Sequence, residues 1–228
     1  MSIWHLLDSG AGDPAVNMAV DEALLEAMPR LQRPVLRFYG WSAAAASFGY
    51  FQSFAEVSRL TPLRPLVRRP TPGGIVPHDA DWTYSLAFPP TDDWYSLPAK
   101  ESYRRVHEWL RGAFNRLGVQ TELAAHRLKA GAGQCFVGYE ASDLLWSGKK
   151  IAGAAQRRRR DGLLIQGSVR PPPLPGLSRA DWQNAMREVA VSASAVKWER
   201  WEGDADLTER VRELMEQKYS QPAYHQKR

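Results

Sequence analysis

The sequence predicts an α+β fold whose sheet is largely antiparallel. In the middle of the chain, short apolar segments follow one another and are separated by two-residue turns, Ser147-Gly148 and Asp161-Gly162. Strands joined by tight turns outnumber strand–helix–strand units, which is the pattern of α+β proteins. Apolar residues at helical spacing over 99–117 indicate a long amphipathic helix.

The first part of the chain contains one predicted helix and several short strands. The helix is Ala15–Ala27, with Asp13 as its N-cap and Pro14 at its first position. The segments with strand character are Ile3–Leu7, Val35–Tyr39, Ala46–Tyr50, Leu66–Arg69 and Thr83–Phe88.

The second part begins with the amphipathic helix, Ala99–Leu117. The strands predicted after it are Cys135–Val137, Ser142–Trp146, Lys150–Gln156 and Leu163–Val169. Pro171–Pro175 ends the sheet, and the helices Ser178–Val189 and Leu207–Tyr219 follow. We therefore expect a single domain over residues 1–228 whose part from about residue 178 is helical.

The composition is that of an ordinary globular protein. The 228 residues are 44% apolar and 24% charged, which is ample for one core. A single cysteine excludes an intrachain disulfide and a multi-cysteine metal site, so no metal is expected. The first residues do not have the pattern of a signal peptide, and no window has the roughly 18 apolar residues of a membrane span. We expect a cytoplasmic protein with no membrane partner.

The charge of the chain indicates what kind of partner it binds. A net charge of +5 favours acidic partners. The basic residues form no recognised nucleic-acid motif, so nucleic acid is not expected as a partner. The run Arg157–Arg160 is typical of a solvated turn.

A glycine-containing loop follows the strand that ends in Arg68 and Arg69. It reads RRPTPGGIVPH over residues 68–78 and includes Thr71, Gly73, Gly74 and His78. Glycines allow backbone N–H groups to approach a ligand closely, and arginines bind phosphate or carboxylate, so the loop is a candidate anion site. A long hairpin turn with surface arginines explains the pattern equally well, and a lone histidine is more often structural than catalytic.

The stretch from Cys135 to Lys150 carries the most chemistry. Lys150 leads into a strand whose residues 152–155 are alanine or glycine, including Gly153 and Ala154. Small residues on both faces leave room for a linear acyl chain, and a lysine there can donate to a carbonyl oxygen. The alternative is that small residues let a helix pack closely. Cys135 near a lysine would be a reactive thiolate, although a lone cysteine is more often buried and inert.

Four segments together resemble the superfamily of lipoate–protein ligases, octanoyltransferases and biotin ligases. They are NMAVDEALL (17–25), LRFYGWSAAAASFGYFQ (36–52), RRPTPGGIVPHDADWTYSLAFP (68–89) and CFVGYEASDLLWSGKKIAGAAQRRRRDGLLIQGSV (135–169). They occur in the family's order and cover most of the first 170 residues. The chain is most similar to octanoyltransferases of the Gram-positive type, which have a Cys-Phe and a glycine–basic–lysine turn at these places.

The resemblance implies a fold like that of class II aminoacyl-tRNA synthetases and biotin ligases, with a curved, mixed and mostly antiparallel sheet. It implies transfer of an octanoyl group from acyl carrier protein to a lysine of a lipoyl domain, such as the glycine cleavage H protein or a 2-oxoacid dehydrogenase E2. Cys135 would be the acylated nucleophile and Lys150 would contact the carbonyl. Loop 69–78 would wall the acyl site, Arg157–Arg160 would dock the acidic partner, and no cofactor would be required.

Departures from the family pattern keep other readings open. The loop has Pro72 where a third glycine is usual, and Gln166 replaces the histidine that commonly precedes Gly167. An ATP-dependent lipoate ligase, which would use ATP and magnesium and bind the phosphates with Arg68, Arg69 and the loop, is the first alternative. A lipoyl amidotransferase and a non-catalytic lipoyl-domain binder are the others.

Overall fold

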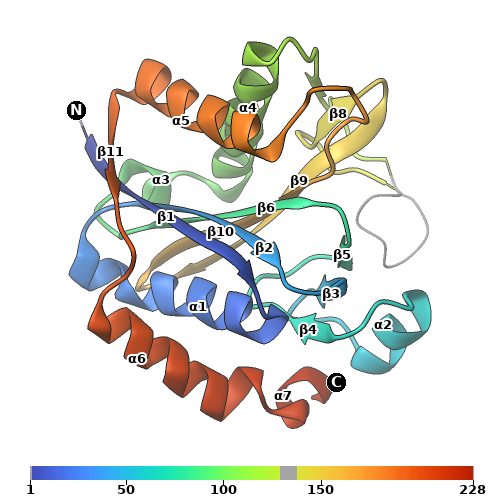
Figure 1. Cartoon of the computed structure of the whole chain (residues 1–228), viewed down its shortest axis with the longest axis vertical. Coiled ribbons are helices and arrows are strands. Elements are labelled where there is room, and N and C mark those ends of the chain that lie inside the picture. Colours follow the sequence, from blue (N-terminus) through green and yellow to red (C-terminus); the bar gives the residue numbers. More distant parts are fainter. Residues whose placement is uncertain (1, 129–137, 228) are drawn as a thin grey trace.

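The computed structural model describes residues 2–128 and 138–227, which fold around two sheets (Figure 1). The larger sheet has eight strands in the order β11-β1-β2-β6-β10-β9-β8-β7 within these residues. Its strands are β1 (Ser2–Gly12), β2 (Val35–Trp41), β6 (Trp82–Phe88), β7 (Glu122–Leu123), β8 (Leu144–Trp146), β9 (Lys149–Arg159), β10 (Gly162–Val169) and β11 (Val196–Arg200). The smaller sheet, β4-β3-β5, consists of β3 (Ala45–Phe48), β4 (Leu66–Arg68) and β5 (Val76–His78).

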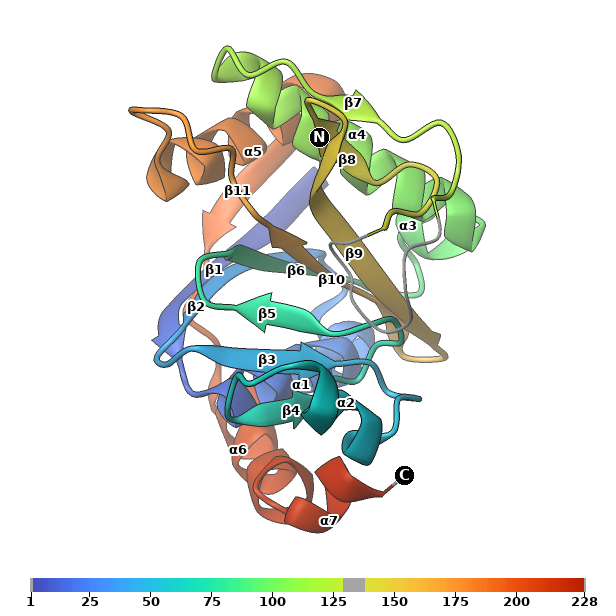
Figure 2. The same cartoon turned by 90° about the vertical axis from the view of Figure 1, so that its right-hand side faces the viewer.

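The helices cover both faces of the larger sheet. Helices α4 and α5 lie on one face, and α1 and α6 lie on the other (Figure 1). The short helix α2 packs beside the smaller sheet (Figure 2). The helical segments are α1 (Pro14–Leu31), α2 (Phe54–Leu60), α3 (Asp93–Ser96), α4 (Ala99–Arg116), α5 (Arg179–Ser194), α6 (Ala205–Leu214), the π-helical turn η1 (Met215–Tyr219) and α7 (Pro222–Gln226).

The predicted fold class is confirmed. Strands β2, β6, β10, β9, β8 and β7 are antiparallel neighbours, whereas β11, β1 and β2 run parallel. The predicted hairpin tip is also present, with Gly148 at φ +73° and Ser147 at φ +49°. Asp13 caps α1, as predicted, by accepting a hydrogen bond from Ala15 N at 2.8 Å.

Two expectations about the order of elements are wrong. The part after residue 178 is not wholly helical, because Val196–Arg200 forms β11 and pairs in parallel with β1 at the other end of the chain. The glycine loop is not the turn of a hairpin, because β3 lies between β4 and β5 in the smaller sheet, and the strand predicted to follow the loop, β6, belongs to the larger sheet. Instead, residues 76–78 form β5, an unpredicted strand that pairs with β3.

Alternation along β2 divides the core into two layers. Leu36 and Phe38 point into a cluster that α4 and α5 cover, whereas Val35 and Tyr39 face a second cluster beneath α1. Successive strand side chains point to opposite faces, and both faces of β2 are covered, so even Arg37 is enclosed and pairs with Asp21 at 2.7 Å. This explains why all residues from Val35 to Gly40 are buried.

A buried carboxylate attaches the C-terminal helices to α1. Glu22 of α1 accepts hydrogen bonds from Lys218 and from Tyr219, which is 2.5 Å away, and Arg159 lies at 3.2 Å. The π-helical turn allows the adjacent residues 218 and 219 to reach the same carboxylate. Burial acts to raise the pKa of Glu22, but the Lys218 charge, the two hydrogen bonds and Arg159 lower it overall.

Among the described residues, no helix combines the length and the apolar character needed to cross a membrane.

Replacing Glu22 with glutamine should destabilise the fold, because the partly buried Lys218 loses its counter-charge. We expect a loss of about 2–3 kcal/mol at pH 7, less than for a fully enclosed pair, since the Lys218 side chain is 20% exposed. The lowered pKa of Glu22 means that its contribution is present above 4.5 and is lost as pH falls through the folded pKa. Urea unfolding at several pH values should show the two proteins converging in acid.

The matched control for this substitution is Glu209→Gln, which removes an exposed ion pair with Arg212. It should leave the free energy of unfolding nearly unchanged. Equal losses for the two variants would contradict the role assigned to Glu22.

Candidate active site

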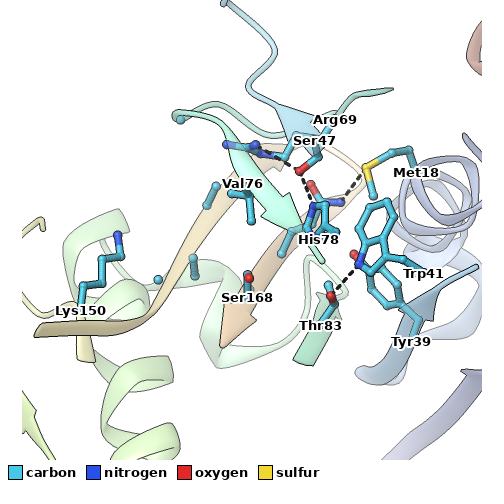
Figure 3. Close-up of a pocket in the computed structure, with 16 residues that line it drawn as sticks. Met18, Tyr39, Trp41, Ser47, Arg69, Val76, His78, Thr83, Lys150 and Ser168 are labelled. Atoms are coloured by element: carbon cyan, nitrogen blue, oxygen red, sulfur yellow. Dashed lines mark hydrogen bonds between the residues drawn. The ribbon is translucent and has the colours of Figure 1, made fainter. Parts of the chain in front are cut away.

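A pocket opens between the two sheets, at β9 and β10 on one side and β3, β5 and the glycine loop on the other (Figure 3). Together with its open mouth, it holds about 540 Å³ of space that no protein atom fills. Lys150 stands at one end, and Met18, Tyr39 and Trp41 lie at the other. The remaining lining residues are Ser47, Arg69, Gly73, Val76, His78, Thr83, Gly153, Ala154, Ala155, Gln166, Gly167 and Ser168.

Missing side-chain bulk on β9 and β10 keeps the pocket open. Gly153, Ala154 and Ala155 line it from β9, and Gly167 lines it from β10. A Cβ atom on Gly167 would lie 2.1 Å from the ring of Tyr84, so this position requires glycine. Gly153 and Ala154 thus lie along the pocket, as the channel prediction requires, while Ala154 also packs against the core cluster beneath α4, as the alternative of close helix packing expects.

Lys150 is held by a buried carboxylate. Its Nζ lies 2.7 Å from Oδ2 of Asp143, with the lysine side chain 9% exposed and the aspartate fully buried. Gly153 makes this position possible, because a Cβ there would lie 2.7 Å from both Cε and Nζ of Lys150. Lys149, in contrast, is exposed at the hairpin tip. Lys150 is thus the lysine that the fold directs into the pocket.

Arg69 organises the opposite wall. It is 4% exposed and donates from Nε to Thr71 at 3.2 Å, from Nη1 to Ser47 at 3.4 Å and from Nη2 to the Pro72 carbonyl at 2.8 Å. The last bond fixes the glycine loop against the pocket. A guanidinium has five N–H donors in one plane, which suits it to bind the glycine loop and β3 at the same time.

One hydrogen-bond chain leads from Arg69 to Asp21. Thr71 donates to Oε1 of Gln166 at 2.6 Å, and Nε2 of Gln166 donates to Asp21 at 2.7 Å. Asp21 also accepts from Arg37, at 2.7 Å, and from Tyr39. The departure at Gln166 is therefore compatible with the fold, because its amide donates and accepts in the same chain.

A second chain leads from Arg69 through Ser47 to Asp81. Nε2 of His78 lies 2.8 Å from Ser47 Oγ, and Nδ1 donates to Asp81 at 2.9 Å. The Trp41 ring stacks on His78 at 3.7 Å, which fixes the imidazole plane. Burial acts to raise the pKa of Asp81, but His78 and the hydrogen bonds from His78, Ser168 and Thr83 lower it overall.

The glycine loop approaches β3 very closely. Gly73 has φ +109°, and a Cβ on Gly49 would lie 2.0 Å from the Gly73 carbonyl oxygen. Only glycine fits at this crossing, so Gly49 and Gly73 together set the position of the loop. Gly73 lines the pocket, whereas Gly74 and the buried Thr71 lie behind the lining.

The fold brings most of the predicted site residues together. Lys150, Arg69, Gly73, His78, Gly153 and Ala154 all line the one pocket. Cys135, and the strand predicted for Cys135–Val137, lie outside the described residues. The roles predicted for these residues stay predictions.

Sequence reasoning missed Asp143, Ser47, Trp41 and Asp81. A signal for Asp143 was present, because a hairpin tip at Ser147-Gly148 brings residues before the turn beside those after it. The other three approach the pocket from strands and turns that are distant in sequence, and no local pattern indicated this.

Arginines assigned to anion or partner binding have structural roles instead. Arg68 is fully buried and donates to the backbone carbonyls of Tyr50, Gln52 and His225, at 2.7, 2.8 and 2.7 Å, so its guanidinium is not presented to a phosphate. The run Arg157–Arg160 is not the solvated turn that was expected, because residues 157–159 belong to β9.

Each of its first three members binds a different element. Arg157 donates to Pro70 O at 2.7 Å, Arg158 lies 3.5 Å from Ser102 Oγ, and Arg159 pairs with Glu22. Only Arg160, whose side chain is 96% exposed, is open to solvent in the way that a docking surface requires.

Comparison with known proteins identifies what this chain resembles. Residues 13–170 match the family described as "Lipoyl protein ligase A/B catalytic domain". The octanoyltransferase LipM of Staphylococcus epidermidis is 34% identical over 180 residues, 73% of this chain and 65% of that protein. LipM of Halalkalibacterium halodurans is 36% identical over 184 residues, 74% of this chain and 66% of that protein. The chain thus spans somewhat less than two thirds of their length.

A solved structure shares the whole fold. The bi-partite lipoate protein ligase from Thermoplasma acidophilum, described together with its E2 lipoyl domain, superposes with a TM-score of 0.75. The superposition covers 99% of this chain and 96% of that chain at 20% identity. At this identity the likeness establishes the fold.

Substituting His78 with alanine should destabilise the protein, because buried Asp81 and Ser47 each lose a partner. We expect a loss of about 2–5 kcal/mol in the free energy of unfolding. The matched control is His126→Ala, at an exposed position, which should cost no more than about 0.5 kcal/mol. Chemical denaturation monitored by tryptophan fluorescence measures both, and a His78→Ala loss as small as that of the control would refute the chain of bonds described above.

Proposed function

This chain belongs to the lipoyl protein ligase A/B catalytic domain family, and we propose that it transfers an octanoyl group from an acyl carrier protein to a lysine of a lipoyl domain. The observation that carries the proposal is the position of Lys150. Its ammonium stands at one end of a pocket that small residues keep open along its length (Figure 3). The octanoyltransferase names of the curated relatives support this reaction.

The pocket suits a linear acyl chain with a polar head. Between its two ends, Val76, Ala154 and Ala155 offer apolar surface to the chain. Thr71 donates to Gln166, and Gln166 donates to the buried carboxylate of Asp21. His78 is bonded to the buried carboxylate of Asp81. These polar groups therefore need no hydrogen bond from the ligand. The only polar part of an octanoyl thioester is its carbonyl, which would lie at the Lys150 end.

The first half-reaction would acylate Cys135. Its thiolate sulfur forms a bond to the carbonyl carbon of the carrier thioester, and the bond from that carbon to the carrier sulfur breaks. The carrier thiolate leaves and takes up a proton. During the attack negative charge develops on the carbonyl oxygen, where a Lys150 ammonium stabilises it more strongly than in water because the pair is shielded from solvent.

The second half-reaction would release the product. The uncharged amine of a lipoyl-domain lysine attacks the octanoyl thioester, a C–N bond forms, and the C–S bond to Cys135 breaks. One amine proton is lost, and the Cys135 thiolate is restored. Because a thioester is exchanged for a thioester and then for an amide, neither step requires ATP or another cofactor.

The partners proposed are an octanoylated acyl carrier protein and a lipoyl domain of the glycine cleavage H protein or 2-oxoacid dehydrogenase E2 type. Both are typically acidic, which suits a chain with a net charge of +5. The similar ligase from Thermoplasma acidophilum is described with an E2 lipoyl domain, which supports a lipoyl domain as acceptor here.

The ATP-dependent ligase is the less favoured reading. It assigned phosphate binding to Arg68 and Arg69, but Arg68 is fully buried against backbone carbonyls and Arg69 braces the loop. The names of the curated relatives also favour transfer over ligation.

Intact-mass spectrometry tests the proposal directly. Incubated with octanoyl-acyl carrier protein and no ATP, the protein should gain the mass of one octanoyl group, and Cys135→Ala should gain none. Addition of a lipoyl domain should discharge the adduct and add the same mass to that domain. Labelling that requires ATP and persists in Cys135→Ala would refute the transferase and favour the ligase.

Lys150→Ala should lower the acylation rate by about 10²–10³-fold, the usual effect of losing one oxyanion donor. Lys149→Ala is the matched control, since that side chain is exposed at the hairpin tip, and it should retain nearly the full rate. Equal rates for the two variants would remove Lys150 from the mechanism.

A further inference from the structure

Asp143 gathers an unusual number of polar groups behind the pocket wall. Its Oδ2 accepts from Lys150 Nζ at 2.7 Å and from the Glu140 backbone N–H at 2.8 Å. Its Oδ1 accepts a short hydrogen bond from Tyr103, and His107 Nε2 lies 3.8 Å away. The carboxylate is fully buried, so each of these contacts is made without competition from solvent.

The groups around Asp143 come from three separate elements. Tyr103 and His107 are one turn apart on α4 and face the same way, with His107 Nδ1 2.8 Å from the Tyr103 carbonyl. Lys150 comes from β9. Tyr84 of β6 lies across Gly167 and, like His107 Nε2, has a buried polar atom without a hydrogen-bond partner in the described part of the chain.

The charges in this cluster belong to Asp143 and Lys150. Burial, followed by the Asp143 charge, raises the pKa of Tyr103 well above its ordinary value, so the phenol stays protonated and donates. Burial lowers the pKa of His107 despite the nearby carboxylate, so its ring is uncharged at neutral pH. Burial and the Asp143 charge also raise the pKa of Tyr84. Lys150 therefore supplies the cation that balances Asp143.

The absence of a side chain at Gly153 leaves room for this ion pair. The Lys150 ammonium occupies the space in which residue 153 would carry a Cβ, and Asp143 Oδ1 would lie 3.2 Å from that atom. Tyr103 donates to Oδ1, and the ammonium lies on Oδ2. A buried ion pair contributes little net stability compared with apolar packing, so its geometry rather than its stability is what the fold gains.

We propose that Asp143 is a positioning residue for acyl transfer, which holds the Lys150 ammonium charged and directed toward the acyl carbonyl, with Tyr103 fixing the carboxylate. The proposal rests on the proposed function, because it gives Lys150 the role of stabilising the oxyanion. Asp143 itself does not contact the substrate. Its effect reaches the reaction through the charge and the position of Lys150.

The test is the pH dependence of single-turnover acylation with octanoyl-acyl carrier protein. Asp143→Asn should slow acylation by about 10–100-fold, as a displacement of about 1 Å in a reacting group does. Without the carboxylate, the ammonium of Lys150 loses the counter-charge 2.7 Å away, so its charged form is disfavoured. Activity should then be lost on the alkaline side at a lower pH than in the wild type.

Asp206→Asn serves as a matched control, because it removes an exposed ion pair with Arg30 far from the pocket. It should keep both the rate and the profile of the wild type. Should Asp143→Asn fail to fold, Tyr103→Phe carries the test. It keeps the packing and should lower kcat by about 3–10-fold with little change in KM for the donor.

The outcomes separate this inference from the proposed function. If the wild type acylates and Lys150→Ala does not, but Asp143→Asn keeps the wild-type rate and profile, Asp143 has no positioning role. If Asp143→Asn slows acylation by the same factor at every pH, so that activity is lost on the alkaline side at the same pH as in the wild type, Asp143 has a structural role only. If no protein is acylated by any donor, the proposed function itself fails.

Discussion

A lysine ammonium that is nine-tenths buried must have a carboxylate beside it, and the architecture of the pocket depends on this requirement. Lys150 meets it through Asp143, at 2.7 Å. The two residues lie on either side of the β8–β9 hairpin, so the tight turn at Gly148 brings them together. Gly153 then leaves the space that the ammonium fills. One ion pair thus accounts for the glycine at 153 and for the position of the only lysine that lines the pocket among the described residues.

The opposite wall follows the same principle. Arg69 is buried, and its charge is connected through two hydrogen-bond chains to the buried carboxylates Asp21 and Asp81. Because the polar groups of these lining residues bond to one another and to buried carboxylates, they do not require hydrogen bonds from a ligand. A chain of methylene groups can lie there without leaving a donor or acceptor unpaired, which links the electrostatics of the walls to the class of substrate proposed.

Local patterns in the sequence predicted the helices and turns whose formation depends on residues close together in the chain. The helix at α4 and the hairpin at Gly148 are set by spacing and by a residue that tolerates positive φ, and both were found. Strand β11 was missed although Val196 and Trp198 alternate with charged residues, because its pairing with β1 joins opposite ends of the chain. The arginines at 157–159 were misread for a similar reason, since their partners are distant in sequence. The small residues and Lys150 were found by composition, but the carboxylate behind them was not.

A crystal structure of the octanoylated protein would test the central claim most directly. The account predicts that the acyl carbonyl oxygen lies about 3 Å from Lys150 Nζ, with the ammonium still on Asp143 and the chain running past Ala154 toward Met18. An acyl chain bound outside this pocket, or a carbonyl more than about 6 Å from Lys150 with no contact to it, would contradict the account.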